Sequence, residues 1–154
     1  VMGIGETHGA AFARAQLAVG QSLPASGVAF LSVRRVDKSQ LKPVAEALLK
    51  RGFELIATRG TATLLQSQGV PCSIVNKVGE GRPHVVDKIK NNEIQFVVNT
   101  TEGEQAMMDS ASIRSSAIQY NVCYTTTLAG AKAACRALGE EPPARIHSLQ
   151  QLYS

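Results

Sequence analysis

The sequence predicts a three-layer α/β/α domain in which helices cover both faces of a mainly parallel, five-stranded sheet. Short apolar runs rich in β-branched residues alternate with helical stretches of about ten to fifteen residues, which is typical of βαβ units. The runs are apolar along their whole length, as strands covered on both faces are. The chain has 154 residues, of which 44% are hydrophobic, so it is long enough for one domain with a substantial core.

Each strand and helix can be placed from this alternation and from the glycines and prolines between the runs. Strands are expected over residues 28–33, 53–58, 72–76, 94–100 and 122–126. Helices are expected over residues 38–51, 61–68, 83–91, 103–119 and 127–138, with a short amphipathic piece over 148–153. Gly52 and Gly69 stand where helix C-caps belong, and Pro83 suits the first turn of a helix.

The first part of the chain has a different character from the rest. Residues 1–20 contain an Ala-rich helical pattern, and residues 21–27 are interpreted as a linker because Pro24 and Gly27 interrupt any regular structure. The domain proper is expected over 28–154. Because position 1 is a valine, we expect the chain to be cut from a longer polypeptide, with residues 1–20 belonging to the end of a preceding domain.

The composition excludes several classes of protein. The 16 Lys and Arg against 12 Asp and Glu give a net charge of +4, which favours an anionic partner. A nucleic-acid partner is not expected, because basic residues interleaved with aromatic ones are missing. No apolar run approaches the roughly 18 residues of a membrane span. The three cysteines form no CxxC pair, which suits a reducing compartment, so a cytoplasmic location is expected.

Polar and basic residues follow four of the predicted strands. The carboxyl ends of parallel strands share one edge of the sheet, where helix N-termini attract anions. Hydroxyl groups, backbone amides and ammonium groups together suit a phosphate. The residues concerned are Ser32, Lys38, Thr58, Arg59, Gly60, Thr61, Lys77, Asn99, Thr100 and Thr101. Such residues are also ordinary helix caps, so a purely structural role remains the alternative interpretation for each.

Candidate catalytic groups are few. His8, His84 and His147 share no helical face and have no metal-binding spacing. No nucleophile elbow, P-loop or dinucleotide-binding glycine motif is present, and the carboxylates near the predicted edge are not paired for acid and base chemistry. We therefore expect no catalytic residue and no metal site, and we interpret the cysteines as small buried hydrophobic residues.

Several long segments form a recognisable set: LSVRRVDK (31–38), GFELIATRGTA (52–62), VNKVGEGRPHVVDKIKN (75–91), VVNTTEG (97–103) and IRSSAIQYNVCYTTTLAGA (113–131). Together they resemble the C-terminal allosteric domain of the large subunit of bacterial carbamoyl phosphate synthase. The start of the chain is similar to the end of the preceding synthetic domain. The resemblance implies a methylglyoxal-synthase-like fold and a regulatory function, in which UMP inhibits, and IMP and ornithine activate, the parent enzyme.

The parent implied by the resemblance is a glutamine-hydrolysing, ATP-dependent ligase of arginine and pyrimidine biosynthesis. It uses ATP with Mg or Mn, and K, whereas no cofactor is expected in this chain. Its other partners would be the remainder of the large subunit, through it the glutaminase small subunit, and possible further copies of itself.

The resemblance also assigns roles to individual residues. The predicted edge residues would hold the phosphate and ribose of UMP or IMP, and Tyr124 and Thr126 would contact ornithine. The sequence departs from the best-known bacterial member at four positions: Arg59 replaces a histidine, Glu104 and Gln105 replace two arginines, and Thr125 replaces an acidic residue. These departures affect the expected strength of each effector.

Two other functions stay open at this point. One is a methylglyoxal synthase-type lyase, but the relevant loop reads GEGRP over residues 79–83 and has no aspartate to serve as the base of such an enzyme. The other is an interaction module that has lost its ligand, and the loss of positive charge at Glu104 and Gln105 is its best support.

Overall fold

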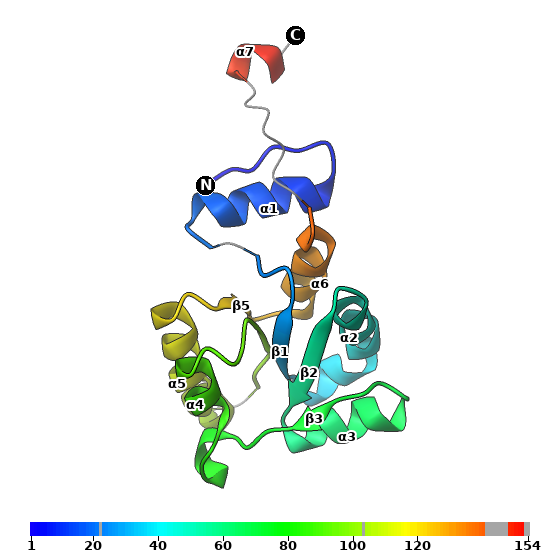
Figure 1. Ribbon diagram of the computed structural model, residues 1–154, viewed down its shortest axis with the longest axis vertical. Coiled ribbons are helices and arrows are strands. Elements are labelled where there is room, and N and C mark those ends of the chain that lie inside the picture. Colours follow the sequence, from blue (N-terminus) through cyan, green and yellow to red (C-terminus); the bar gives the residue numbers. More distant parts are fainter. Residues whose placement is uncertain (22, 103, 141–147, 153–154) are drawn as a thin grey trace.

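The computed structural model describes residues 1–21, 23–102, 104–140 and 148–152, and these residues form a five-stranded, all-parallel sheet (Figure 1). The strands are β1 (Gly27–Ser32), β2 (Phe53–Ala57), β3 (Ser73–Ile74), β4 (Phe96–Asn99) and β5 (Cys123–Thr125). They lie in the order β3-β2-β1-β4-β5, with Phe30 opposite both Ile56 and Val97 in the register. The predicted fold class and all the predicted strands are confirmed, although β3, at the sheet edge, is much shorter than expected.

Alternating side chains of the central strands build two cores, one on each face of the sheet. Leu31, Leu55 and Val98 point to one face, where they pack with residues of α2 (Leu41–Lys50), α3 (Arg59–Ser67) and α6 (Leu128–Ala137). Phe30 and Val97 point to the other face, beneath α4 (Val85–Lys90) and α5 (Glu104–Gln119). The three predicted layers are therefore present, because a strand with apolar residues at every position needs cover on both sides.

The helix predicted from Lys38 begins as a 3-10 helix, η1 (Arg35–Gln40), and becomes α-helical only at Leu41. Pro43 explains the difference, because it has no N–H to donate to the carbonyl of Ser39 and so cannot continue an α-helix from further upstream. It is tolerated in the first turn of α2, where such bonds are missing in any case. The C-cap prediction is consistent with the backbone, since Gly52 and Gly69 have φ angles of 82° and 77°.

The helix predicted from Pro83 starts later, at Val85, so the placement of Pro83 in its first turn is wrong. His84 is the N-cap: its Nδ1 accepts a hydrogen bond from the backbone N–H of Asp87, whose carboxylate accepts one from the N–H of His84. This reciprocal pair satisfies two amides that the first turn leaves without partners. A short 3-10 helix, η2 (Val78–Glu80), precedes it and was not predicted.

The N-terminal helix α1 (His8–Ala18) packs against α6, at the end of the molecule that carries the N-terminus (Figure 1). Thr7 caps it by accepting a hydrogen bond from the N–H of Ala10, and Phe12 packs against the core. The assignments of residues 1–20 to a preceding domain, of 21–27 to a linker and of 28–154 to the domain proper stay predictions. A last short helix, α7 (Leu149–Leu152), falls within the predicted 148–153 piece, whose Tyr153 is outside the described residues.

The remaining helices differ little from expectation. The predicted first residue of α5, Gly103, lies outside the described residues, and so does His147. Within the described residues, no helix combines the length and apolar character needed to cross a membrane.

Cys123 and Cys135 are buried as expected, while Cys72 is half-buried. Burial raises the pKa of the Cys123 thiol to about 12 and that of Cys135 to about 11, so both stay protonated and act as small apolar side chains.

Candidate functional site

A cavity of about 440 Å³ lies at the carboxyl ends of β1, β2 and β4, bounded on one side by α5. From β1 the chain continues outward to β2 and β3, and it then returns to place β4 on the other side of β1. The ends of β1 and β4 therefore diverge at the point where the strand order reverses. In open α/β sheets, this is where ligands bind, because the connections leave in opposite directions and open a crevice.

The cavity brings together most of the residues that the sequence predicted for an anion site. The predicted residues in its lining are Ser32, Thr58, Lys77, Asn99, Thr100 and Thr101. They come from the ends of three strands and from the segment after β3. The remaining predicted residues, Lys38, Arg59, Gly60 and Thr61, do not line it.

Lys38 and Thr61 instead support the segments around the cavity. The ammonium of Lys38 donates a hydrogen bond to the carbonyl of Gly60 at 3.1 Å, which ties η1 to the start of α3. The hydroxyl of Thr61 is buried and accepts bonds from the hydroxyl of Thr58, at 3.3 Å, and from the N–H of Val33, at 3.4 Å. Lys38 and Thr61 thus stabilise the backbone next to the cavity without lining the cavity themselves.

Asn99 is the centre of a polar network inside the cavity. It is 3% exposed, and its side-chain nitrogen donates to the hydroxyls of Ser110, at 3.0 Å, and Tyr124, at 3.1 Å. These bonds connect β4 with α5 and β5. With both amide hydrogens used, the side-chain oxygen is held in one orientation at the end of β4. Burial of this amide is therefore compensated by its hydrogen bonds, as a buried polar group requires.

Arg34 and Arg35 also line the cavity, although the sequence analysis did not select them. Arg34 forms an ion pair with Asp37, with Nε 2.7 Å from Oδ2, and its backbone N–H donates to the hydroxyl of Thr100. The hydrogen bond from Arg34 lowers the pKa of Asp37, so this carboxylate is ionised. Arg34 and Arg35 could have been predicted from the sequence, because they follow the first strand closely. Ser110 and Ile113, from the middle of α5, could not be found this way, because only the packing of that helix brings them to the cavity.

Of the two predicted ornithine contacts, Tyr124 lies within β5 and Thr126 directly follows this strand. Thr126 lines a second cavity of about 350 Å³, which shares Arg34, Thr100 and Thr101 with the first. Tyr124 lines neither cavity; its ring lies 6.0 Å from the guanidinium of Arg114, and its hydroxyl meets Asn99. Within the described part of the chain, the two residues are therefore not brought into one cavity, and their shared role stays a prediction.

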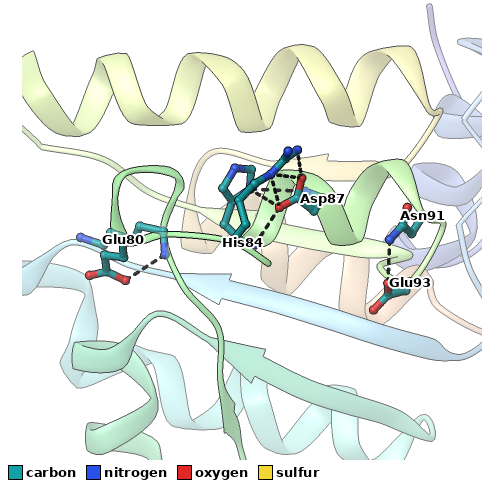
Figure 2. A network of polar contacts seen from close by, with 7 residues as sticks. Glu80, His84, Asp87, Asn91 and Glu93 are labelled. Carbon is teal, nitrogen blue, oxygen red and sulfur yellow. Dashed lines mark hydrogen bonds and ion pairs between the residues drawn. The ribbon is translucent and has the colours of Figure 1, made fainter.

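The loop that carries Lys77 into the cavity is held by polar contacts (Figure 2). The carboxylate of Glu80 turns back and accepts a hydrogen bond from the backbone N–H of Lys77 at 2.9 Å. Further along, Arg82 pairs with Asp87, which also accepts from the N–H of His84. These bonds lower the pKa of Asp87 to about 2, and the contribution of Arg82 is the largest. The loop can therefore present Lys77 at a defined place.

Charge in the cavity is uneven. Arg34, Arg35 and Lys77 supply cations, while Glu102 is a carboxylate in the lining and its charge also acts on Arg34. Val78, Ala106 and Ile113 contribute an apolar part. An arrangement of this kind suits a ligand with an anionic end and a flat or apolar end.

Two of the positions at which the sequence departs from the best-known bacterial member, Glu104 and Arg59, are exposed and lie outside the cavity lining. The side chain of Gln105, a third such position, is not among those described.

The structure is thus an α/β domain with a candidate ligand cavity at the strand-order reversal. Residues 40–126 match the MGS-like domain family, and the chain belongs to that family. The crystal structure of methylglyoxal synthase from Elizabethkingia anophelis NUHP1 superimposes with a TM-score of 0.57 over 73% of this chain and 79% of that one. The sequences are 20% identical, so this similarity shows the fold alone.

Much closer sequence relatives are large chains of carbamoyl phosphate synthase. The one from Xanthomonas campestris pv. campestris is 56% identical over 153 residues, which is 99% of this chain and 14% of that protein. The one from Pseudomonas aeruginosa is 49% identical over 154 residues, which is 100% of this chain and again 14% of that protein. The chain is thus similar over its whole length to a small part of much longer proteins.

Proposed function

We propose that this chain is the allosteric regulatory domain of a carbamoyl phosphate synthase large subunit and that it binds UMP and IMP in the cavity at the strand-order reversal. The observation that carries the proposal is the set of three cations, Arg34, Arg35 and Lys77, grouped there with hydroxyl donors and an apolar wall. Cations and hydroxyls match a ribose phosphate, and the apolar wall formed in part by Val78 and Ile113 matches a base.

Relatives support the assignment to this polypeptide. Similarity at 49–56% identity extends over virtually all of the chain, and both relatives described above are named as carbamoyl phosphate synthase large chains. The ATP-dependent ligase activity would belong to the longer protein, and this domain would act on it by preferring different conformations when UMP or IMP is bound. A ligand shifts such an equilibrium only by its difference in affinity between the two states, so about tenfold selectivity gives about 1.4 kcal/mol of bias.

Ornithine is proposed as a second activator at the neighbouring cavity, where Thr126 lies. This cavity shares a wall of Thr100, Thr101 and Arg34 with the nucleotide cavity. A cationic amino acid requires carboxylate partners. Asp37 is the carboxylate in this lining, and Arg34 already pairs with it. The proposal therefore assigns the other acidic contacts to the longer polypeptide.

A methylglyoxal synthase-type lyase is the second candidate, because a protein of that name has the same fold. Such an enzyme needs a carboxylate that is free to remove a proton from its substrate. Glu80, in the loop beside the cavity, uses its carboxylate on the backbone of Lys77, and this favours a loop-holding role. Glu102 is the carboxylate left in the lining, and it follows the end of β4.

Isothermal titration of the chain with UMP, IMP, ornithine and dihydroxyacetone phosphate separates these functions. Binding of UMP and IMP in competition, with no methylglyoxal formed from dihydroxyacetone phosphate, is expected. Formation of methylglyoxal would instead establish the lyase, and failure of all four to bind would favour an interaction module.

The variants Lys77→Ala and Lys90→Ala provide the matched comparison for this titration. Lys77 lines the cavity, whereas Lys90 is exposed in the last turn of α4 and outside the cavity lining. Loss of UMP affinity in the first variant alone would support the cavity as the site. Equal affinity in both would contradict it.

A further inference from the structure

A groove of about 420 Å³ between α2 and α6 lies on the face of the sheet away from α4 and α5. Both helices start at the carboxyl edge of the sheet and run back, so their last turns are at the opposite edge from the nucleotide cavity. Its apolar part consists of Pro43, Val44, Ala47 and Cys135.

The rest of the groove lining is basic. Lys50 and Arg51 come from the end of α2, and Lys132 and Arg136 come from α6. No Asp or Glu of the described residues lines the groove. Within the described residues, none of these four forms an ion pair with a carboxylate; Lys132 donates to the side-chain oxygen of Gln40. Among the described residues, four cations without a carboxylate partner therefore surround one groove.

Stabilisation of helix ends accounts for part of this charge. Lys50 and Arg136 are in the last turns of their helices, where a cation interacts favourably with the helix dipole. The dipole does not account for Lys132, which is in the middle of α6. It also does not explain why all four cations surround an apolar groove.

The groove favours a polypeptide over a small phosphate. Helix C-termini carry partial negative charge and so oppose a compact dianion, which binds better at helix N-termini. An apolar floor adds nothing for a free phosphate, but it can take the apolar side chains of a segment whose carboxylates meet the cations on either side. Long Lys and Arg side chains reach such carboxylates without losing the packing of their aliphatic parts.

We infer that this groove docks an acidic amphipathic segment of the longer large-subunit polypeptide. The inference rests on the proposed function, because the relatives supply the partner: this chain spans 14% of their length, so most of their sequence lies outside it. The groove is a contact through which movement of this domain would be transmitted to the rest of the polypeptide, and it is separate from the nucleotide cavity.

The test is site-specific photo-crosslinking in the full-length polypeptide, with a photoreactive residue replacing the half-buried Ala47 in the groove. The expected result is a cross-link, found by mass spectrometry, to a segment outside these 154 residues that is rich in Asp and Glu and carries apolar residues. Cross-links that stay within this chain, that reach a second copy or a segment without acidic residues, or that are missing altogether would overturn the inference.

Charge reversal provides the control. Lys50→Glu and Lys90→Glu both change an exposed lysine in the last turn of a helix, so both lose the same dipole stabilisation, but only Lys50 lines the groove. Lys50→Glu is expected to lower the cross-link yield on the order of fivefold and Lys90→Glu to leave it unchanged. Equal yields, with equal melting temperatures, would contradict the docking role.

UMP binding separates this inference from the proposed function. Because Lys50 is in the last turn of α2, towards the opposite edge of the sheet from the cavity, and does not line that cavity, Lys50→Glu should leave UMP affinity unchanged. If the wild-type polypeptide shows the cross-link to an acidic segment but does not bind UMP, the proposed ligand is refuted and the docking role of the groove is supported. UMP binding without the cross-link would support the proposed ligand and refute the docking role of the groove.

Discussion

The guanidinium of Arg34 is held by the carboxylate of Asp37, with Nε of the first 2.7 Å from Oδ2 of the second. Arg34 lines both cavities, and Asp37 lines the smaller of them. Any phosphate that enters the larger cavity therefore meets an arginine that already has an anionic partner. The two residues set the positive charge that is available to a ligand.

Asp37→Asn is expected to strengthen UMP binding about threefold, because the phosphate no longer competes with a carboxylate for Arg34. The gain should shrink as salt is raised, since the competing charges are partly exposed. Calorimetric titration at low and high ionic strength provides the measurement. Weaker binding in this variant would mean that Asp37 helps the site by positioning Arg34.

The variants Lys77→Ala and Lys38→Ala should differ, although the sequence predicted the same role for both. Lys77 lines the cavity, so its loss should weaken UMP and IMP together by about tenfold. Lys38 contacts the carbonyl of Gly60, so its loss should cost less than about threefold. A larger effect at Lys38 would show that its side chain turns to the ligand when one is bound.

Tyr124→Phe should destabilise the fold, because one amide hydrogen of the buried Asn99 loses its acceptor. An unsatisfied buried donor costs about 1–3 kcal/mol, and urea unfolding measures the change. Tyr120→Phe is the matched control, since Tyr120 is 42% exposed. If both variants unfold at the same urea concentration, the hydroxyl of Tyr124 contributes nothing to stability.

Acid should weaken the start of α4 through Asp87. The hydrogen bonds of Arg82, and after them the N–H of His84, lower its pKa from 3.8 to about 2 in the folded protein. Because the folded pKa lies below the unfolded one, the contribution to stability is fully present above about pH 4 and is lost as the pH falls towards 2.

Urea unfolding of the wild type and of Asp87→Asn across this range tests the effect. The stability difference between them should be largest at pH 5 and should shrink towards pH 2. The exposed Glu54 gives the control variant Glu54→Gln. If the stability difference between the wild type and Asp87→Asn is the same at every pH, ionisation of the Asp87 carboxylate does not contribute to stability.

Some local features could be predicted from the sequence, and others could not. Pro43 has no N–H, so the later start of α2 follows from elementary chemistry, even though the helical pattern suggested an earlier one. The start of α4 at Val85 depends on a reciprocal bond between His84 and Asp87. Histidine is an unusual cap, so composition gave little indication of it.

By itself the sequence determined the α/β class, the alternation of strands and helices and the edge of the sheet at which polar residues gather. These follow from hydrophobic periodicity and from the rule that parallel strands end at one edge. Only the tertiary structure decided that β4 lies beside β1, which opens the cavity and brings Ser110 of α5 to Asn99. It also turned Lys38 to Gly60, paired Arg34 with Asp37 and placed Lys50 near Arg136. The physical reason is that strand order and side-chain partners depend on contacts between residues far apart in the chain or on neighbouring turns, which periodicity does not encode.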